Sequence, residues 1–103
     1  MSMRQFIAQV PKYVTLRENL QVKNEVKRKV VSDLEKSLTA TFPDYTDLST
    51  VDGLRLALKN GWLLIRASGT EPLIRLTVEG ESLKAAQTIM QKGKALVKEQ
   101  AGE

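Results

Sequence analysis

Charged and hydroxyl side chains that suit anion binding are concentrated between residues 66 and 75. Arg66 and Arg75 flank a short turn, and each guanidinium presents a planar fork of donors that matches two oxygens of a phosphate group. Ser68 and Thr70 add hydroxyl donors within the turn. Gly69 can adopt positive φ and lets backbone N–H groups approach a ligand, and successive N–H groups in a turn can form an anion-binding nest. This stretch predicts a site for phosphate or another oxyanion.

A phosphate site here would not need a metal. A hydrogen bond to a charged group contributes about 1.5–3 kcal/mol, so two guanidinium forks and two hydroxyls suffice to hold a phosphate. The same residues also allow a simpler interpretation. A Ser-Gly-Thr turn between strands is nevertheless common, and arginines at strand ends often lie in solvent. Pro72 has no N–H and a fixed φ, so it stiffens the exit of the turn under either interpretation. The residue types alone give no information about a sugar.

The composition excludes several kinds of catalytic site. The 103 residues include no cysteine and no histidine, which excludes disulfides, thiolate chemistry and imidazole general bases. A chain of this length suits one domain, and the lack of cysteine suits a reducing compartment. The longest purely apolar run, residues 62–65, is far too short to span a bilayer. We therefore expect a cytoplasmic protein without a membrane partner.

Hydrophobic periodicity predicts the elements that position the turn. Alternating apolar residues predict strands at residues 13–22, 47–51, 54–59, 62–67 and 73–79. The Asn60-Gly61 pair predicts a tight hairpin turn with those two residues at its centre. The turn of interest, residues 68–72, then joins two neighbouring antiparallel strands and brings Arg66 and Arg75 close together.

Two long helices are predicted around these strands. The first runs from residue 23 to 39, with Val26 on its buried side and Lys27 on its solvent side; its other buried residues recur every four positions at Val30, Leu34 and Leu38. The second runs from Leu83 to about Gln100, with a buried stripe of Ala86, Ile89, Met90, Leu96 and Val97. A short helix is also predicted between Ser2 and Val10, ended by Pro11.

The order of elements favours an α+β fold. The economical arrangement is an antiparallel sheet of four or five strands with the two main helices packed on one face, which leaves the other face open for binding. Residues 1–12 are interpreted as the end of an interdomain linker with a helical turn. Residues 13–103 form the predicted domain.

One stretch resembles the phosphate-binding loop of the α-D-phosphohexomutases: Arg66-Ala67-Ser68-Gly69-Thr70-Glu71-Pro72-Leu73-Ile74-Arg75. It fits without a gap the family pattern, which is close to Arg-x-Ser-Gly/Asn-Thr-Glu-Pro followed by an arginine. Asp52-Gly53, Gly61-Trp62 and Glu79 match the flanks, and the likeness extends from about Pro11 to Val97. The chain is therefore similar to the C-terminal, fourth domain of these enzymes, which has a TATA-binding-protein-like fold.

This resemblance implies a role within a larger enzyme. Phosphoglucomutases, phosphomannomutases and phosphoglucosamine mutases are isomerases of carbohydrate metabolism that interconvert hexose or hexosamine 1- and 6-phosphates by intramolecular phosphotransfer. In that family a phosphoserine lies in the first domain, magnesium in the second and a sugar-selecting loop in the third, while the fourth binds the phosphate that does not react. The implied partners are thus a phosphosugar and the other three domains, with no cofactor in this domain. The implied phosphate ligands are Arg66, Ser68, Gly69, Thr70 and Arg75.

Glu71 has two possible roles. It either orients an arginine or the loop, or it is a solvated turn residue.

The chain lacks two segments of the family that take part in catalysis. These are the Ser-His-Asn-Pro and Asp-Gly-Asp-x-Asp-Arg segments, so the chain is not expected to catalyse the mutase reaction alone. It is either an excised domain, which the linker-like N-terminus favours, or a natural stand-alone binding module.

Two other functions remain open at this point. A basic cluster from Lys23 to Lys29 could serve a stand-alone nucleic-acid-binding module. Against this, the chain has only two Phe, two Tyr and one Trp with which to stack bases, and no nucleic-acid partner is the expectation. The remaining alternative is a purely structural or dimerising domain.

Overall fold

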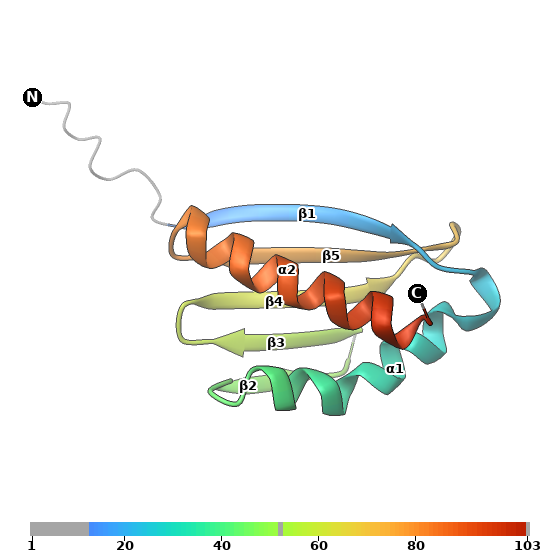
Figure 1. Ribbon diagram of the computed structural model, residues 1–103, viewed down its shortest axis with the longest axis horizontal. Coiled ribbons are helices and arrows are strands. Elements are labelled where there is room, and N and C mark those ends of the chain that lie inside the picture. The colour runs from blue at the N-terminus through green and yellow to red at the C-terminus, as the bar shows by residue number, and fades with distance from the viewer. Residues whose placement is uncertain (1–12, 52, 103) are drawn as a thin grey trace, which may run out of the picture.

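Both helices lie on one face of a single sheet in the computed structural model, which describes residues 13–51 and 53–102 (Figure 1). The chain order is β1 (Val14–Gln21), α1 (Asn24–Thr41), β2 (Asp47–Ser49), β3 (Leu54–Leu58), β4 (Gly61–Ala67), β5 (Leu73–Gly80) and α2 (Leu83–Gln100). The five strands are antiparallel in the order β1-β5-β4-β3-β2. The predicted α+β fold is confirmed, whereas the helix predicted before Pro11 lies outside the described residues.

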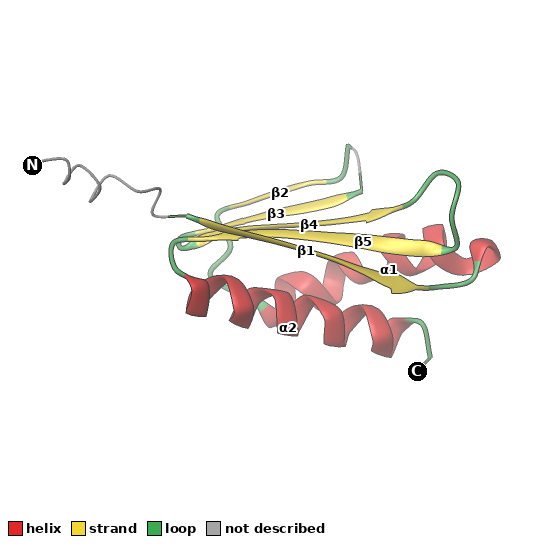
Figure 2. Ribbon diagram, turned by 90° about the horizontal axis from the view of Figure 1, so that it is seen from above, coloured by secondary structure: helices red, strands yellow, loops and turns green. Residues whose placement is uncertain are grey.

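The sheet has one covered and one uncovered face, as Figure 2 shows. Leu63 and Ile65 of β4 and Leu76 of β5 have no exposed surface and pack under the helices. Successive side chains of a strand point to opposite faces, so the strand residues directly next to these three project from the uncovered face. Arg66 of β4 and Arg75 of β5 are among them, and both are exposed.

The buried stripe of α1 differs from the prediction at the start of the helix. Lys27 is only 4% exposed, while Val26 is 36% exposed. The stripe follows Lys27, Val30, Val31, Leu34 and Leu38. A strict four-residue spacing drifts by about 40° per step on a helix of 3.6 residues per turn, so Val26 is rotated by about 120° from Leu38. The assignment of Val26 to the core and of Lys27 to the solvent side was therefore wrong.

Helix α2 begins and packs much as its sequence predicts. The hydroxyl of Ser82 accepts a hydrogen bond from the N–H of Ala85 at 3.1 Å and caps the helix. The buried stripe includes Gly93, whereas Leu96 is only partly buried. A Cβ atom at Gly93 would lie 3.2 Å from a methyl group of Leu76. Close packing on the sheet therefore explains a glycine inside the helix.

The hairpin between β3 and β4 is confirmed, but its turn lies one residue earlier than predicted. Leu58 pairs with Gly61, so Lys59 and Asn60 form the turn and Gly61 already belongs to β4. Gly61 has a φ of +154°, and a Cβ atom there would lie 1.9 Å from the carbonyl oxygen of Glu79 on β5. The glycine is required by the approach of β5 rather than by the turn itself.

Replacing Gly61 tests this packing at the end of the sheet opposite the residue 68–72 loop. Gly61→Ala is expected to lower the free energy of unfolding by at least about 2 kcal/mol, because β5 must shift and the backbone is strained. Denaturant unfolding measures the loss. Gly69→Ala is the matched control, since a Cβ at Gly69 meets nothing within 4 Å. Equal stability losses in the two variants would contradict the packing described here.

Candidate functional site

The register of β4 and β5 sets the geometry of the candidate anion site. Arg66 and Arg75 are direct partners in the antiparallel pair, and the N–H of Ser68 donates to the carbonyl of Leu73 at 3.0 Å to close the connection. Cβ atoms of directly facing residues lie about 5 Å apart. The expectation that the turn brings the two arginines close together is thus confirmed. Their role as phosphate ligands stays a prediction.

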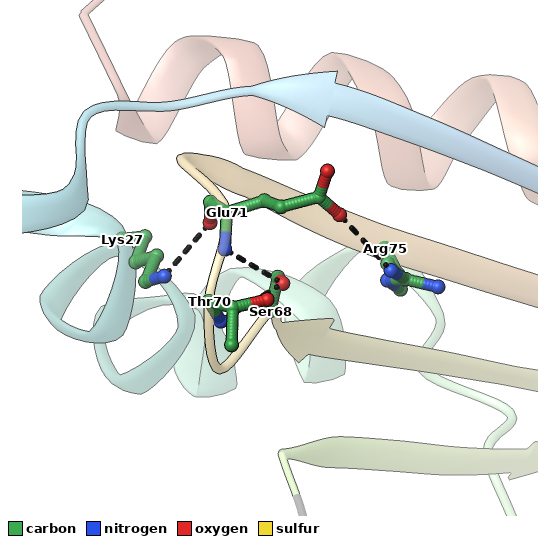
Figure 3. Close-up of polar contacts among 5 residues, drawn as sticks. All are labelled: Lys27, Ser68, Thr70, Glu71 and Arg75. Carbon is green, nitrogen blue, oxygen red and sulfur yellow. Dashed lines mark hydrogen bonds and ion pairs between the residues drawn. The ribbon is translucent and has the colours of Figure 1, made fainter.

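Ser68 organises the loop that follows β4 (Figure 3). Its side chain is buried, and its Oγ accepts hydrogen bonds from the N–H groups of Thr70 at 3.3 Å and Glu71 at 3.1 Å. Both N–H groups therefore point into the loop, and they do not form the outward nest that the sequence suggested. The hydroxyl can still donate its own proton to one further acceptor.

Gly69 lies at the exposed tip of the loop, but not for the reason the sequence suggested. Positive φ occurs at Gly53, Gly61 and Gly102 and not at Gly69, so the expected left-handed conformation is not used. A Cβ at Gly69 would meet nothing within 4 Å. The fold therefore leaves open space beside this residue, into which a ligand could approach the backbone.

Glu71 contacts two different parts of the site. Its Oε1 accepts a hydrogen bond from a guanidinium N–H of Arg75 at 3.3 Å, and both side chains are more than half exposed. Such an exposed pair adds little stability, but it favours one orientation of the arginine, as one of the two interpretations of Glu71 anticipated. The backbone carbonyl of Glu71 accepts a hydrogen bond from Lys27 Nζ at 2.8 Å. The sequence analysis missed Lys27 because it assigned this residue to the solvent side of the helix.

A pocket of about 370 Å³ lies beside the loop and includes a residue that the sequence analysis did not assign to the site. Arg66 and Gly69 line it together with Arg28 of α1. The rest of the lining is Val31, Val51, Gly53 and Ala67. Ser68, Thr70 and Arg75 are not part of this lining, so the predicted ligands are divided between the pocket, the loop interior and the uncovered sheet face.

The basic cluster on α1 does not form one continuous surface. Lys27 is buried, and Lys29 forms an ion pair with Asp33 at 2.6 Å. These contacts give no support to the nucleic-acid alternative. Within residues 13–51 and 53–102, no helix is long and apolar enough to cross a membrane, and no three His, Cys, Asp or Glu residues group as a metal site.

Comparison with known proteins places the chain in a family. Residues 18–94 match the family model of the phosphoglucomutase/phosphomannomutase C-terminal domain. The chain belongs to this family. In this phosphoglucomutase/phosphomannomutase C-terminal domain, the matched segment extends from β1 into α2. The arginine pair and the loop between the two arginines therefore lie well within the match.

Several full-length proteins contain a domain similar to this one. The chain is 44% identical over 98 residues to a phosphoglucosamine mutase of Methanocaldococcus jannaschii, covering 92% of this chain and 21% of that protein. It is 43% identical over 91 residues to a probable phosphoglucosamine mutase of Pyrococcus furiosus, covering 88% and 20% respectively. This phosphoglucomutase/phosphomannomutase C-terminal domain therefore spans about one fifth of the length of these relatives.

A solved structure has the same fold. A phosphoglucomutase/phosphomannomutase family protein of Burkholderia thailandensis superposes with a TM-score of 0.65 over 95% of this chain and 20% of that protein. The sequence identity is 24%, so this likeness concerns the fold alone.

Removing the Ser68 hydroxyl tests its role in the loop. Ser68→Ala is expected to lower the free energy of unfolding by about 1–2 kcal/mol, because two N–H groups lose their acceptor. Amide hydrogen exchange at Thr70 and Glu71 should accelerate in the same variant. Ser49→Ala is the control, since Ser49 accepts a long hydrogen bond from Val51 N–H at 3.4 Å. Unchanged exchange at Thr70 and Glu71 would show that Ser68 does not hold the loop.

Proposed function

We propose that this domain binds the non-reacting phosphate of a phosphosugar within a phosphoglucosamine mutase-type enzyme that interconverts hexosamine 1- and 6-phosphates. The observation that supports this most is the direct pairing of Arg66 with Arg75 beside the Ser68 loop. Two relatives with over 40% identity are named phosphoglucosamine mutase or probable phosphoglucosamine mutase, which favours a hexosamine phosphate over a hexose phosphate.

A phosphate between the two arginines suits the electrostatics of the strand pair. Two guanidinium groups at directly facing positions place positive charge of one sign at the same part of the sheet, and a bound dianion would complement that charge. Each guanidinium can donate two parallel hydrogen bonds to phosphate oxygens. The Thr70 hydroxyl, the Ser68 hydroxyl proton and the open approach to Gly69 complete the proposed set of ligands, which are the residues named from the sequence.

The contribution of this domain to catalysis would be binding rather than chemistry. Holding a phosphate remote from the reacting centre fixes the substrate for phosphoryl transfer, and this binding energy lowers the barrier when it is fully realised in the transition state. The phosphoserine and the magnesium would belong to other domains of the parent enzyme. The residues described here offer no carboxylate cluster that fits a magnesium ion, so no proposed step in this domain involves a metal.

A titration tests the proposed function. Glucosamine 6-phosphate is added to the 103-residue chain while backbone amide shifts are followed by NMR. We expect saturable binding in the millimolar range, with the largest shifts between residues 66 and 75. Inorganic phosphate should produce the same pattern and glucosamine without phosphate should produce none. Shifts on oligonucleotide addition that are confined to residues 23–30, without any response to phosphate, would favour the nucleic-acid alternative.

Arginine-to-lysine variants test the geometry of the proposed site. Arg66→Lys and Arg75→Lys keep the charge but lose the fork, so each should weaken glucosamine 6-phosphate binding by about tenfold, which corresponds to about 1.4 kcal/mol. Arg55→Lys is the matched control, because the Arg55 guanidinium lies over the Trp62 ring at 5.0 Å on the same sheet face. A loss of affinity in Arg55→Lys as large as that in the other two would mean that overall surface charge, not the fork, binds phosphate.

A further inference from the structure

A buried lysine lies directly behind the proposed phosphate loop. Lys27 belongs to the first turns of α1, and only 4% of its surface is exposed. Its Nζ donates to the backbone carbonyl of Glu71 at 2.8 Å, a contact between residues 44 positions apart in the sequence (Figure 3). Lysine is almost never fully buried without a partner, so its position here requires an explanation.

The hydrogen-bond partner of Lys27 carries no opposite charge. Burial of an ammonium is costly, and its partner here is a neutral carbonyl rather than a carboxylate. In the part of the chain that the structure describes, Lys27 forms no ion pair. The residue also lies near the N-terminus of α1, where the helix dipole disfavours a cation. A bound anion nearby would be stabilised by such a charge.

The contact also fixes the backbone of the loop. The Glu71 carbonyl accepts from Lys27 Nζ and from the N–H of Leu73, and the neighbouring Pro72 carbonyl accepts from Val22 N–H at 2.9 Å. Val22 and Lys27 thus tie the exit of the loop to the junction of β1 and α1. Ser68 holds the entrance of the same loop through its Oγ.

We infer that Lys27 is a positioning residue for phosphate binding. Its ammonium holds the Glu71 carbonyl, keeps residues 68–72 in the binding conformation and adds positive charge behind the loop. This inference rests on the proposed function and extends it to a residue outside the motif. Lys27 acts through the loop backbone, and no direct contact with the substrate is required.

Affinity for inorganic phosphate tests this role in the 103-residue chain. Lys27→Met keeps the length of the apolar stem but removes the ammonium, and phosphate binding should weaken by at least about fivefold. Lys27→Arg keeps charge and donors and should bind within about twofold of the unmodified chain. Lys36→Met removes an exposed charge from the same helix and should also bind within about twofold.

A destabilised control separates positioning from stability. Leu58 of β3 is partly buried, and it is the register partner of Gly61 at the end of β4 away from the loop. Leu58→Ala should lower the midpoint of thermal unfolding without weakening phosphate binding. If Lys27→Met does not fold, Lys27→Gln replaces it, with an amide donor in place of the charge, and the same thresholds apply.

The outcomes distinguish this inference from the proposed function. Phosphate binding by Lys27→Met within about twofold of the unmodified chain would overturn the inference and leave the proposed function standing. An equal loss in Leu58→Ala would also overturn it, because the effect would then follow stability. A failure of the unmodified chain to bind phosphate would overturn the proposed function and the inference together.

Discussion

The direct pairing of two arginines across β4 and β5 is the constraint on which the candidate site depends. Arg66 and Arg75 are direct partners on the uncovered face of the sheet, an arrangement that costs free energy unless negative charge lies nearby. The carboxylate of Glu71 supplies part of that charge to Arg75, but an exposed ion pair contributes little. In the function proposed here, a phosphate would add further negative charge, since both guanidinium groups could donate to it at once.

The rest of the fold serves to hold these groups in place. The buried residues of β4 and β5 pack under both helices, which fixes the register of the two strands and therefore the facing of the arginines. Ser68 holds the loop between them, and Val22 and Lys27 tie its exit to the start of α1. The backbone of the loop is thus held by contacts within the domain, which would limit the entropy lost if a ligand binds there.

The sequence predicted most of the fold because the apolar positions of its strands alternate cleanly and each element has clear ends. The prediction of the buried side of α1 failed at Val26 and Lys27, because apolar residues spaced by four drift around a helix. The buried partner of Lys27 is a loop carbonyl, which the helix sequence does not reveal. The candidate ligands between residues 66 and 75 were named from local spacing and from the family resemblance, and their role stays a prediction. The inward orientation of the Thr70 and Glu71 N–H groups, and the place of Arg28 beside Arg66, depend on tertiary packing and were not predictable.

A crystal structure of the chain with glucosamine 6-phosphate tests the central claim most directly. The account predicts phosphate oxygens within about 3 Å of guanidinium nitrogens of both Arg66 and Arg75, with the sugar directed away from the sheet. A phosphate bound by only one of these arginines, or bound on the outer face of α1 instead, would contradict the account.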